Sequence, residues 1–579
     1  MRWRGRFHFK RKEAEIMKKP LLSEMTLREK IGQMLMPYGR NVYCREAGEA
    51  IDVFCEREDM TDLRTEEELR AYLKKENFGA FRADERDAFL AKYPSDGGDL
   101  SAHRSHVEAL CAYGNLPALT AGDFSFTGLG GTFAELTTLP APLAVGAADS
   151  EELAYALGGQ LAKEMRLAGA NWLFGPDVRI AHQFGTAMMT AFALHDTERL
   201  TRLAKAYIKG VTDNGAAVAI KHFPGGDRYD YRDPDVSPTV ISSDREEWWR
   251  EQGTILKELI DGGVPSVMVG HTAFPAVDDT VLEGHYIPAS VSKKIVTDFL
   301  KGELGFTGVA VTDVIASPTL ITCFSSPAEL LIALVNAGND MISGAFPGAG
   351  DILERAVLDG VISEARIDDA CARILAMKEK LGLFAEPAPH GDLGEITAET
   401  RRVSAQIAER AITLVRDTQG LLPVPSSRIK TATIVYFTHT DQLLPHMEHM
   451  KAEIEKRGIK VKLQHRVDEP QDMERVDMES DLIIYVVYVV PNFPKGHPII
   501  YGAECAGCQF TFSQGQTKSI GISMGYPYVH HDLFGNAETF INTYGCSDEL
   551  IDACVEVILG ERDAAGNSPV KIVPDQIWY

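Results

Sequence analysis

The feature that most constrains the fold is a regular alternation of short apolar runs with helical stretches between residues 25 and 385. The runs are rich in Val, Ile and Ala, and most end in a polar residue or Gly, which is typical of buried parallel strands. They read LPALTAGD, NWLFGPDV, AAVAIKHF, PSVMVGH, GVAVTD and NDMISG. The intervening stretches carry apolar residues at helical spacing and close on Gly. This repetition predicts a parallel α/β fold, with a (β/α)8-type barrel as the best fit.

Polar side chains stand at the ends of these predicted strands. They are Asp123, Asp177, Lys221 with His222, His271 and Asp313. In a (β/α)8 barrel the carboxyl ends of the strands converge on one mouth, where the chemistry takes place. One polar residue after a strand is usually part of a loop, but five sites in register indicate a catalytic mouth.

A second, smaller region follows the barrel. The Pro- and Gly-containing run AEPAPHGDLGEIT interrupts the alternation and predicts a linker over residues 386–400. Beyond it, the helical patterns ETRRVSAQIAERAITLV and HMEHMKAEIEKRG are mixed with the apolar runs TATIVYF, KVKLQHR, DLIIYVVYVV and SIGISMG. This mixture predicts an α/β sandwich domain over 401–579, after a catalytic barrel over 17–385. Residues 1–16 are basic without an apolar run, and are interpreted as a leader with no packed role.

Composition and charge limit the possible binding partners and the cellular compartment of the protein. The formal net charge of −24 disfavours nucleic acid and anionic membrane surfaces, and no stretch reaches the roughly 18–20 apolar residues of a membrane span. Nine scattered cysteines, an odd number, favour a reducing cytoplasm. Cys505 and Cys508 form a CxxC without a second pair, so two incidental thiols are favoured over zinc. We expect no metal or organic cofactor, interpret His446 and His449 as surface residues, and find no feature that specifies an oligomeric state.

Several segments together resemble a known family. KHFPGGDRYDYRDPD, SVMVGHTAFPAVDD, GVAVTD and NAGNDMISG, with EKIGQMLM near the start, resemble glycoside hydrolase family 3, above all its two-domain β-N-acetylglucosaminidases. The resemblance runs from Met25 to GYPYVHHDLFGNAETFINTYGCSDE in the second region. It implies a retaining exo-β-glycosidase that hydrolyses terminal sugars of the N-acetylglucosamine type. The partner it implies is a carbohydrate substrate.

The resemblance also implies roles for the residues at the mouth. The VTD segment carries the nucleophile of the family, which is Asp313 here and would form a glycosyl-enzyme intermediate. The alternative, that Asp313 only caps the following helix, is weaker in this context. Lys221 and His222 match residues that hold sugar hydroxyls, and Asp123 matches an aspartate that grips the hydroxyls farthest from the scissile bond. His271 lines the same mouth, as a wall or as a contact.

The acid/base loop departs from the family pattern. In the related N-acetylglucosaminidases, the loop after KHFPG carries an Asp-x-His pair, in which the His transfers the proton and the Asp orients it. Here the loop carries Asp233, Pro234 and Asp235, so Asp235 stands where the His is expected. No histidine lies between His222 and His271.

Several hypotheses for the acid/base follow. In the first, Asp235 itself transfers the proton, with its pKa raised by Asp233 and by burial. In the second, Glu246 or Glu247 supplies the proton. In the third, the chain is a non-catalytic sugar-binding homologue with a degenerate loop. A further alternative is a β-glucosidase or xylosidase of the same family, which uses Glu504 of the second domain. We favour Asp235, because Pro234 restricts Asp233 to an extended conformation and so favours a defined loop pose.

Two further inferences concern specificity and reaction type. The family usually carries a sugar-binding Arg in an RSFG-like segment, which corresponds here to residues 190–193 (TAFA), with no Lys or Arg between Arg179 and Arg199. The glycosidase assignment is therefore firmer than the sugar assignment. Some relatives release the sugar to phosphate, but an anionic Asp235 would repel a phosphate dianion by about 1–4 kcal/mol at contact. The sequence therefore predicts hydrolysis.

Overall fold

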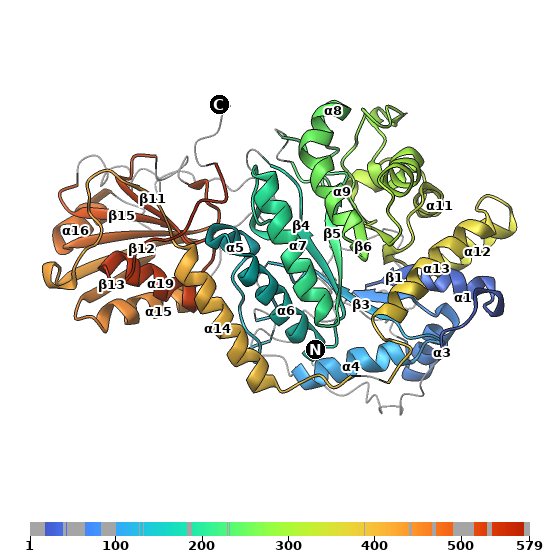
Figure 1. Ribbon diagram of the computed structural model, residues 1–579, viewed down its shortest axis with the longest axis horizontal. Helices are drawn as coiled ribbons and strands as arrows, with labels where there is room; N and C mark the ends of the chain where they lie inside the picture. Colours follow the sequence, from blue (N-terminus) through green and yellow to red (C-terminus); the bar gives the residue numbers. More distant parts are fainter. Residues whose placement is uncertain are drawn as a thin grey trace.

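The computed structural model describes residues 18–38, 42, 64–82, 100–126, 128–130, 133–181, 188–228, 230, 232–386, 388–438, 443–465, 470–489, 515–529 and 535–571. Two α/β domains lie side by side along the long axis, and helix α14 (Leu393–Ala411) runs along the side of the first toward the second (Figure 1). The predicted leader over 1–16, Glu504 and the Cys505–Cys508 pair fall outside the described residues. No helix among those that are described has the length and apolar character needed to cross a membrane.

The first domain is an eight-stranded parallel barrel. Its strands are β1 (Leu35–Pro37), β2 (Ala80–Arg82), β3 (Leu119–Gly122), β4 (Trp172–Asp177), β5 (Ala217–Phe223), β6 (Ser266–Val269), β9 (Val309–Thr312) and β10 (Ile342–Ala345). Parallel ladders run in the order β2-β3-β4-β5-β6-β9, and β1 pairs with β10. A Val311–Met341 bridge joins β9 to the β10 side, and Gly79 N donates to Leu35 O (3.2 Å) on the β1 side. The ring is thus closed, which confirms the predicted barrel.

Helices surround this barrel. They are α1 (Leu27–Gln33), α3 (Glu66–Glu76), α4 (Leu100–Ala112), α5 (Pro142–Ala148), α6 (Glu151–Leu167), α7 (Thr197–Asp213), α9 (Thr254–Asp261), α11 (Pro327–Ala337), α12 (Ala349–Leu358) and α13 (Glu364–Lys380). Their starts follow capping rules: Ser150 accepts from Leu153 N ahead of α6, and Asp196 accepts from Arg199 N ahead of α7. Six of the eight strands match predicted runs. β1 and β2 are only three residues long and fully buried, so they show no alternation to recognise.

The second domain is a six-stranded sheet with helices on it. Its strands are β11 (Thr413–Asp417), β12 (Thr431–Thr438), β13 (Lys460–His465), β14 (Leu482–Tyr488), β15 (Lys518–Ser523) and β16 (Thr539–Asn542), in the order β11-β16-β15-β14-β12-β13. Among the described ladders of this sheet, only β11 runs antiparallel to its neighbour. The helices are α15 (Leu444–Glu455), α16 (Pro470–Glu479) and α19 (Asp548–Leu559). The predicted α/β sandwich is therefore confirmed.

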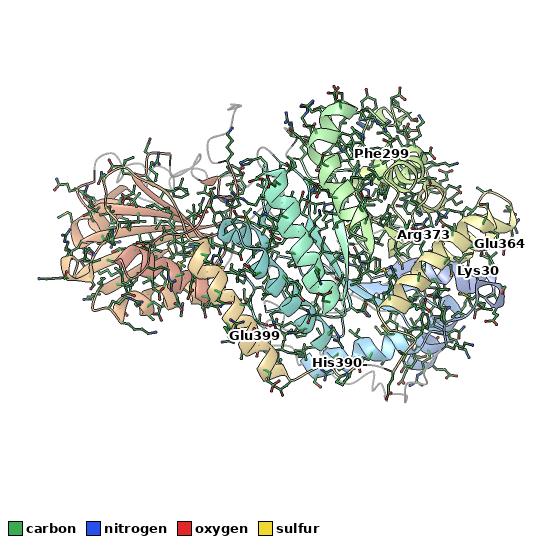
Figure 2. All side chains as sticks on the ribbon, in the orientation of Figure 1. Lys30, Phe299, Glu364, Arg373, His390 and Glu399 are labelled. Atoms are coloured by element: carbon green, nitrogen blue, oxygen red, sulfur yellow. The ribbon has the colours of Figure 1, made fainter. Side chains whose placement is uncertain are left out.

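Two boundary predictions are corrected at the junction of the domains. The segment 386–400 is not a linker throughout, because α14 begins at Leu393, where Asp392 accepts from Glu395 N as its N-cap. The Pro and Gly cues end before this cap, and the residues after it favour a helix. Within the remaining connection, His390 Nε2 lies 2.9 Å from Glu108 of α4, which ties this stretch to the barrel (Figure 2). The predicted helix through ITLV also ends early, since α14 stops at Ala411, and Thr413 and Leu414 pair with β16 at the start of strand β11.

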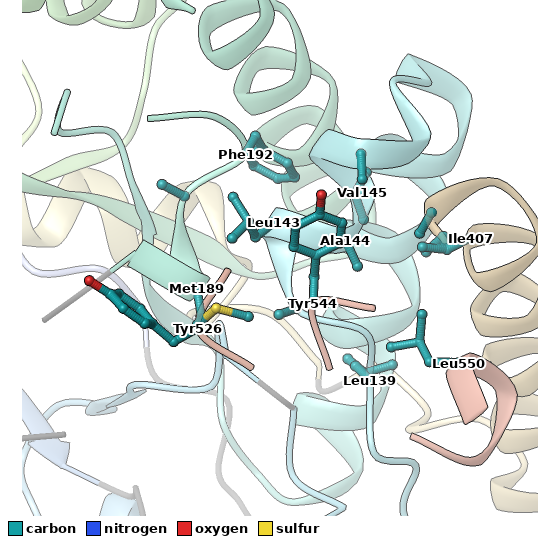
Figure 3. Close-up of a cluster of buried hydrophobic side chains, with 14 of the residues drawn as sticks. Leu139, Leu143, Ala144, Val145, Met189, Phe192, Ile407, Tyr526, Tyr544 and Leu550 are labelled. Atoms are coloured by element: carbon teal, nitrogen blue, oxygen red, sulfur yellow. The ribbon is translucent and has the colours of Figure 1, made fainter. Parts of the chain in front are cut away.

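The two domains share one hydrophobic core. Barrel residues Leu143, Val145 and Phe192 lie in the same buried cluster as Ile407 of α14 and Tyr544 of the second domain (Figure 3). On the barrel side of this core, α5 and the segment at Phe192 approach so closely that position 146 requires glycine, because an added Cβ would lie 1.7 Å from the Phe192 carbonyl oxygen. An interface of this kind packs like the interior of a domain. We therefore expect the two domains to unfold together.

Phe192→Ala is expected to lower the free energy of unfolding by about 3–5 kcal/mol, because it leaves a cavity in this shared core. Phe192 is fully buried and its ring lies edge-on to Tyr207, with centroids 5.3 Å apart. Urea unfolding followed by circular dichroism measures the change. Leu358→Ala, at a side chain that is 72% exposed, is the matched control and should change little. Two separate unfolding transitions in the native chain would contradict the shared core.

Candidate active site

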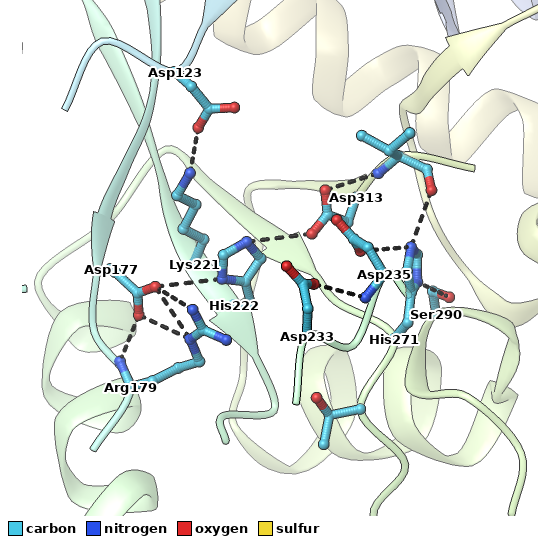
Figure 4. A network of polar contacts seen from close by, with 12 residues as sticks. Asp123, Asp177, Arg179, Lys221, His222, Asp233, Asp235, His271, Ser290 and Asp313 are labelled. Atoms are coloured by element: carbon cyan, nitrogen blue, oxygen red, sulfur yellow. Dashed lines mark hydrogen bonds and ion pairs between the residues drawn. The ribbon is translucent and has the colours of Figure 1, made fainter. Parts of the chain in front are cut away.

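The carboxyl ends of the barrel strands bring the predicted polar residues together. Asp123 follows β3, Asp177 ends β4, Lys221 and His222 lie near the end of β5, and His271 and Asp313 follow β6 and β9. Figure 4 shows their side chains converging on one region, with Asp313 between His222 and the loop that carries Asp233 and Asp235. Every residue predicted for the site lies in this network. The arrangement fits the general rule that barrel chemistry occurs at the carboxyl end of the strands.

Asp313 is the central carboxylate. Its Oδ1 accepts a hydrogen bond from Val314 N (2.8 Å), and its Oδ2 lies 3.2 Å from His222 Nε2. Burial would raise the pKa of Asp313, but the hydrogen bond from His222 and the positive charge of Lys221 outweigh it and hold that pKa far below its usual range. Asp313 is therefore ionised at neutral pH. The helix-cap alternative finds no support, because α10 (Pro318–Ile321) starts five residues later, after Ser317.

His222 stands between two carboxylates. Its Nδ1 lies 3.5 Å from Asp177 Oδ2, on the side of the ring away from Asp313. Asp177 is in turn held by Arg179, whose Nη2 donates to Oδ2 (2.7 Å) and whose Nε contacts both carboxylate oxygens (3.1 Å). Burial would raise the pKa of Asp177, but Arg179 and His222 outweigh it and lower that pKa. This chain of contacts fixes the ring that faces the central carboxylate.

Arg179 was not predicted as a site residue. The signal available in the sequence was its place two residues after Asp177, at the end of a predicted strand. With Arg179 Nη2 2.7 Å from Asp177, the pair is bidentate and part-buried, a geometry that Arg provides better than Lys.

A second cluster lies around Asp123. Lys221 Nζ contacts Asp123 Oδ1, and Arg82 Nη2 donates to Asp123 Oδ2 (3.0 Å). The Arg82 side chain is only 1% exposed and its guanidinium lies 4.8 Å from the centre of the Phe174 ring. The cluster offers a carboxylate acceptor with fixed donors beside it, which suits the recognition of sugar hydroxyls. Arg82 was also not predicted as a site residue, because it ends strand β2, which the sequence did not predict.

The loop after β5 is folded toward Asp313. Asp233 Oδ1 accepts from Asp235 N (3.0 Å), so the first carboxylate fixes the backbone of the second. The Asp235 carbonyl accepts from Ser317 Oγ (2.6 Å) and Thr319 N (3.4 Å), which anchors the loop to the segment after Asp313. Figure 4 shows the side chains of Asp233 and Asp235 on the side of the loop that faces Asp313.

The two loop aspartates have different surroundings. Burial raises the pKa of Asp233, and the charge of Asp313 adds to this effect, although Arg179 and the hydrogen bond from Asp235 N oppose it. Asp235 Oδ1 lies 3.6 Å from His271 Nε2. Asp235, which the resemblance places where the related loops carry a histidine, is therefore next to a histidine from a neighbouring strand end.

The structure does not support the glutamates that were considered as alternative proton donors. Glu246 and Glu247 lie in the first turn of α8 (Arg245–Trp248), and their charged contacts are with Arg250 (3.8 Å) and Arg228 (2.9 Å). These contacts hold them on the helix surface and give no support to a role as proton donor. Glu504 falls outside the part of the chain that the structure describes.

Residues 190–193, where the resemblance places the Arg-bearing stretch, pack in the core of the protein. Ala191, Phe192 and Ala193 are buried in the core between the domains, and Leu194 N donates to Pro569 O (3.2 Å). These positions are apolar because the chain packs against the second domain here. The basic groups that the structure places next to Asp123 are instead Arg82 and Lys221.

Among the described residues, one group of side chains could surround a metal ion. His449, Glu453 and Asp552 of the second domain have ligand atoms within 4.8 Å of one another. His449 Nε2 lies 2.7 Å from Asp552, and Glu453 pairs with Lys456 and with Arg457 (3.2 Å). Because ion pairs already engage these groups, we assign no metal to them, and the absence of a cofactor stays a prediction.

Comparison with known proteins decides the family. Residues 26–377 match the model of the glycosyl hydrolase family 3 N terminal domain. The chain belongs to glycosyl hydrolase family 3. A curated relative, a "Beta-N-acetylglucosaminidase/beta-glucosidase" of Cellulomonas fimi, is 26% identical over 460 residues, which cover 76% of this chain and 81% of the relative. "Beta-hexosaminidase A" of Pseudoalteromonas piscicida is 27% identical over 46% of this chain and 47% of its own length.

Two solved structures share the fold of this family 3 chain. A "Beta-glucoside phosphorylase BglX" gives a TM-score of 0.79 at 24% identity, over 96% of this chain and 95% of that one. A family 3 β-N-acetylglucosaminidase from Paenibacillus sp. str. FPU-7 gives a TM-score of 0.75 at 24% identity, over 95% of this chain and all of that one (100%). Both alignments extend through the second domain, so the two-domain arrangement is that of known structures.

Proposed function

We propose that this family 3 chain is a retaining exo-β-glycosidase that hydrolyses terminal sugars through a glycosyl-enzyme intermediate on Asp313. The single observation that carries the proposal is the buried, ionised Asp313 at the barrel mouth, with His222 3.2 Å from one oxygen and Val314 N bound to the other. Such a carboxylate is oriented and negatively charged, as a nucleophile toward an anomeric carbon must be.

Asp235 takes the role of acid/base in this proposal. In the first step Asp313 attacks the anomeric carbon, and protonated Asp235 gives its proton to the leaving oxygen as the glycosidic bond breaks. In the second step ionised Asp235 takes a proton from water, whose oxygen displaces Asp313 from the sugar. Asp233 supports the role, because its side chain holds the Asp235 backbone in place.

Asp123, Lys221 and His222 would bind the hydroxyls of the terminal sugar. Their support is the arrangement at the mouth: Asp123 is held by Arg82 (3.0 Å) and contacts Lys221, while His222 faces Asp313. A donor and an acceptor at fixed positions discriminate between sugar epimers, because a misplaced hydroxyl leaves a buried polar group unpaired. His271 is treated separately below.

The terminal sugar that we propose is of the N-acetylglucosamine type. Support comes from the motifs that resemble those of N-acetylglucosaminidases and from the names of two curated relatives, one of which is also named a β-glucosidase. The odd number of scattered cysteines supports a cytoplasmic location as part of the same proposal. The five cysteines that the structure describes are all free thiols.

A panel of 4-nitrophenyl β-glycosides tests the activity and the sugar in one assay. We expect kcat/KM to be highest for N-acetylglucosaminide, lower for glucoside and xyloside, and the product in phosphate buffer to be free sugar. Hydrolysis is expected because the carboxylates of Asp233 and Asp235 face the position from which a phosphate dianion would attack, at a cost of about 1–4 kcal/mol each at contact.

Each outcome of this assay has its own meaning. Abundant sugar 1-phosphate would overturn hydrolysis but leave the nucleophile intact. A preference for glucoside or xyloside would replace the proposed sugar. Silence across the whole panel, combined with measurable sugar binding, would favour the non-catalytic sugar-binding alternative, because a 4-nitrophenyl leaving group needs little help from an acid.

A further inference from the structure

His271 is fully enclosed at the centre of the site and touches the loop that carries Asp235. It follows β6 and is 1% exposed. Its Nδ1 lies 2.9 Å from Ser290 Oγ of η4 (Ala289–Val291), and its Nε2 lies 3.1 Å from the carbonyl oxygen of Val314 and 3.6 Å from Asp235 Oδ1. One imidazole therefore connects the helical turn after β8 (His285–Tyr286), the residue next to Asp313, and the loop carboxylate.

The contacts of His271 assign its proton. The Val314 carbonyl can only accept a hydrogen bond, so Nε2 carries the hydrogen. In the neutral ring Nδ1 is then an acceptor, and the Ser290 hydroxyl donates to it. Ser290 thus selects the tautomer whose N–H points at the side on which Asp235 lies, as partners of a histidine commonly do.

We propose that His271 is the positioning residue for Asp235, so that a loop aspartate and a strand-end histidine together replace the Asp-x-His pair of the related loops. The inference rests on the proposed function, because it assumes that Asp235 transfers the proton. Compared with the related loops, the two residue types have exchanged roles. The aspartate transfers the proton, and the histidine, from a different strand, orients it.

Burial, rather than the charges around it, favours a neutral His271 ring. The groups that face it are Asp235 and Asp233 of the loop, Asp313 after β9 and His222 of β5, with Ser290 and the Val314 carbonyl as neutral partners. Burial lowers the pKa of His271, and His222 lowers it further, while Asp313, the Val314 carbonyl and Asp233 oppose this effect. A neutral donor can favour the ionised form of Asp235 after proton transfer without competing for the proton.

A matched pair of substitutions isolates the Nε2 position. The amide of Gln reaches where Nε2 stands, whereas the amide of Asn reaches only where Nδ1 stands. His271→Gln keeps a donor toward Val314 and Asp235, and is expected to retain most of the activity. His271→Asn keeps a partner for Ser290 but loses that donor, and is expected to lower kcat by about ten- to one hundred-fold on an alkyl glycoside.

Three measurements distinguish a positioning role of His271 from a purely structural one. The loss in His271→Asn should shrink to within about threefold for a dinitrophenyl glycoside, whose leaving group needs no proton. The alkaline limb of the pH–rate profile for the alkyl glycoside should move, because it reports the group that must be protonated. Ser290→Ala, which removes the partner of Nδ1, should shift the same limb in the same direction. The melting temperature of each variant controls for folding.

Measurements in the Asp235→Ala variant distinguish a failure of the His271 role from a failure of the proposed acid/base. If His271 acts through Asp235, adding His271→Asn to Asp235→Ala brings no further loss on the alkyl glycoside. An equal loss on both leaving groups, an unchanged pH profile, or full additivity overturns the role of His271. If Asp235→Ala itself shows no dependence on the leaving group, the proposed acid/base falls, and the role of His271 falls with it.

Discussion

Asp313→Ala is expected to lower kcat/KM for every substrate, including aryl glycosides, by a factor on the order of 10⁵, the scale on which removal of a nucleophile acts in other enzymes. The loss does not depend on the leaving group, because without a carboxylate at this position no glycosyl-enzyme forms. Asp313→Asn keeps the acceptor for Val314 N and should be equally inactive, which separates the loss of the nucleophile from a local change of structure.

Direct labelling gives the sharper measurement. A 5-fluoro glycosyl fluoride of the preferred sugar, which keeps the substituent at C2, should form a slowly hydrolysed ester with the native enzyme. Mass spectrometry of the digested protein should find the label on the peptide that contains GVAVTD. Asp227→Asn is a suitable control, because this loop carboxylate is bound to Ser242 (2.6 Å) and should be dispensable for catalysis. A label on any other carboxylate would contradict the assignment of Asp313.

Much of the barrel could be predicted because its signals are local. The runs that became β4, β5, β6 and β9 are continuous and apolar, and the residues that end them are polar. The direction of a parallel strand alone determines that these ends meet at one mouth. For this reason the residues proposed for the site were found together in the structure.

Local signals were weaker where packing decides the structure. β1 and β2 are three-residue strands whose side chains are wholly buried, so neither alternation nor length distinguishes them from a loop. Arg82, which pairs with Asp123 at the barrel mouth, was therefore not predicted. In the same way, the residues around Phe192 are apolar because they pack against the second domain, which the sequence alone does not indicate.

The partnership between Asp235 and His271 could not be predicted from spacing. The two residues lie on different elements, thirty-six positions apart. The resemblance places both members of the acid/base pair in the loop, so nothing in the loop sequence indicates a partner on another strand. Only the fold of the loop, held by Ser317 and Thr319, brings Asp235 Oδ1 to 3.6 Å from His271 Nε2.

Asp235→Ala is expected to lower kcat/KM for an alkyl glycoside or a natural disaccharide by about 10²- to 10⁴-fold, the usual contribution of a general acid. The effect on the first step for a dinitrophenyl glycoside should be small, because that leaving group departs without a proton. The second step should slow, because no base then activates water. A burst of dinitrophenol followed by a slow steady state is therefore expected, and stopped-flow absorbance measures it.

Azide provides the decisive complement to this substitution. Azide is a nucleophile that needs no base, and removal of the Asp235 carboxylate opens space and takes away a negative charge beside the intermediate. Added azide should restore turnover of the dinitrophenyl glycoside and yield the β-glycosyl azide, since two inversions retain configuration. The native enzyme, with its carboxylate in place, should form no such product and serves as the control.

Asp233→Ala is the matched comparison within the loop. Asp233 holds the Asp235 backbone N–H but is not proposed to transfer the proton, so its loss should lower activity on the alkyl glycoside without rescue by azide. If azide instead rescued Asp233→Ala and not Asp235→Ala, the proton would be carried by Asp233. The raised pKa of Asp233 would then be the property on which catalysis depends, and Asp235 would be its anchor. Rescue of Asp235→Ala alone would establish that the aspartate in the place of the family histidine does the work of that histidine.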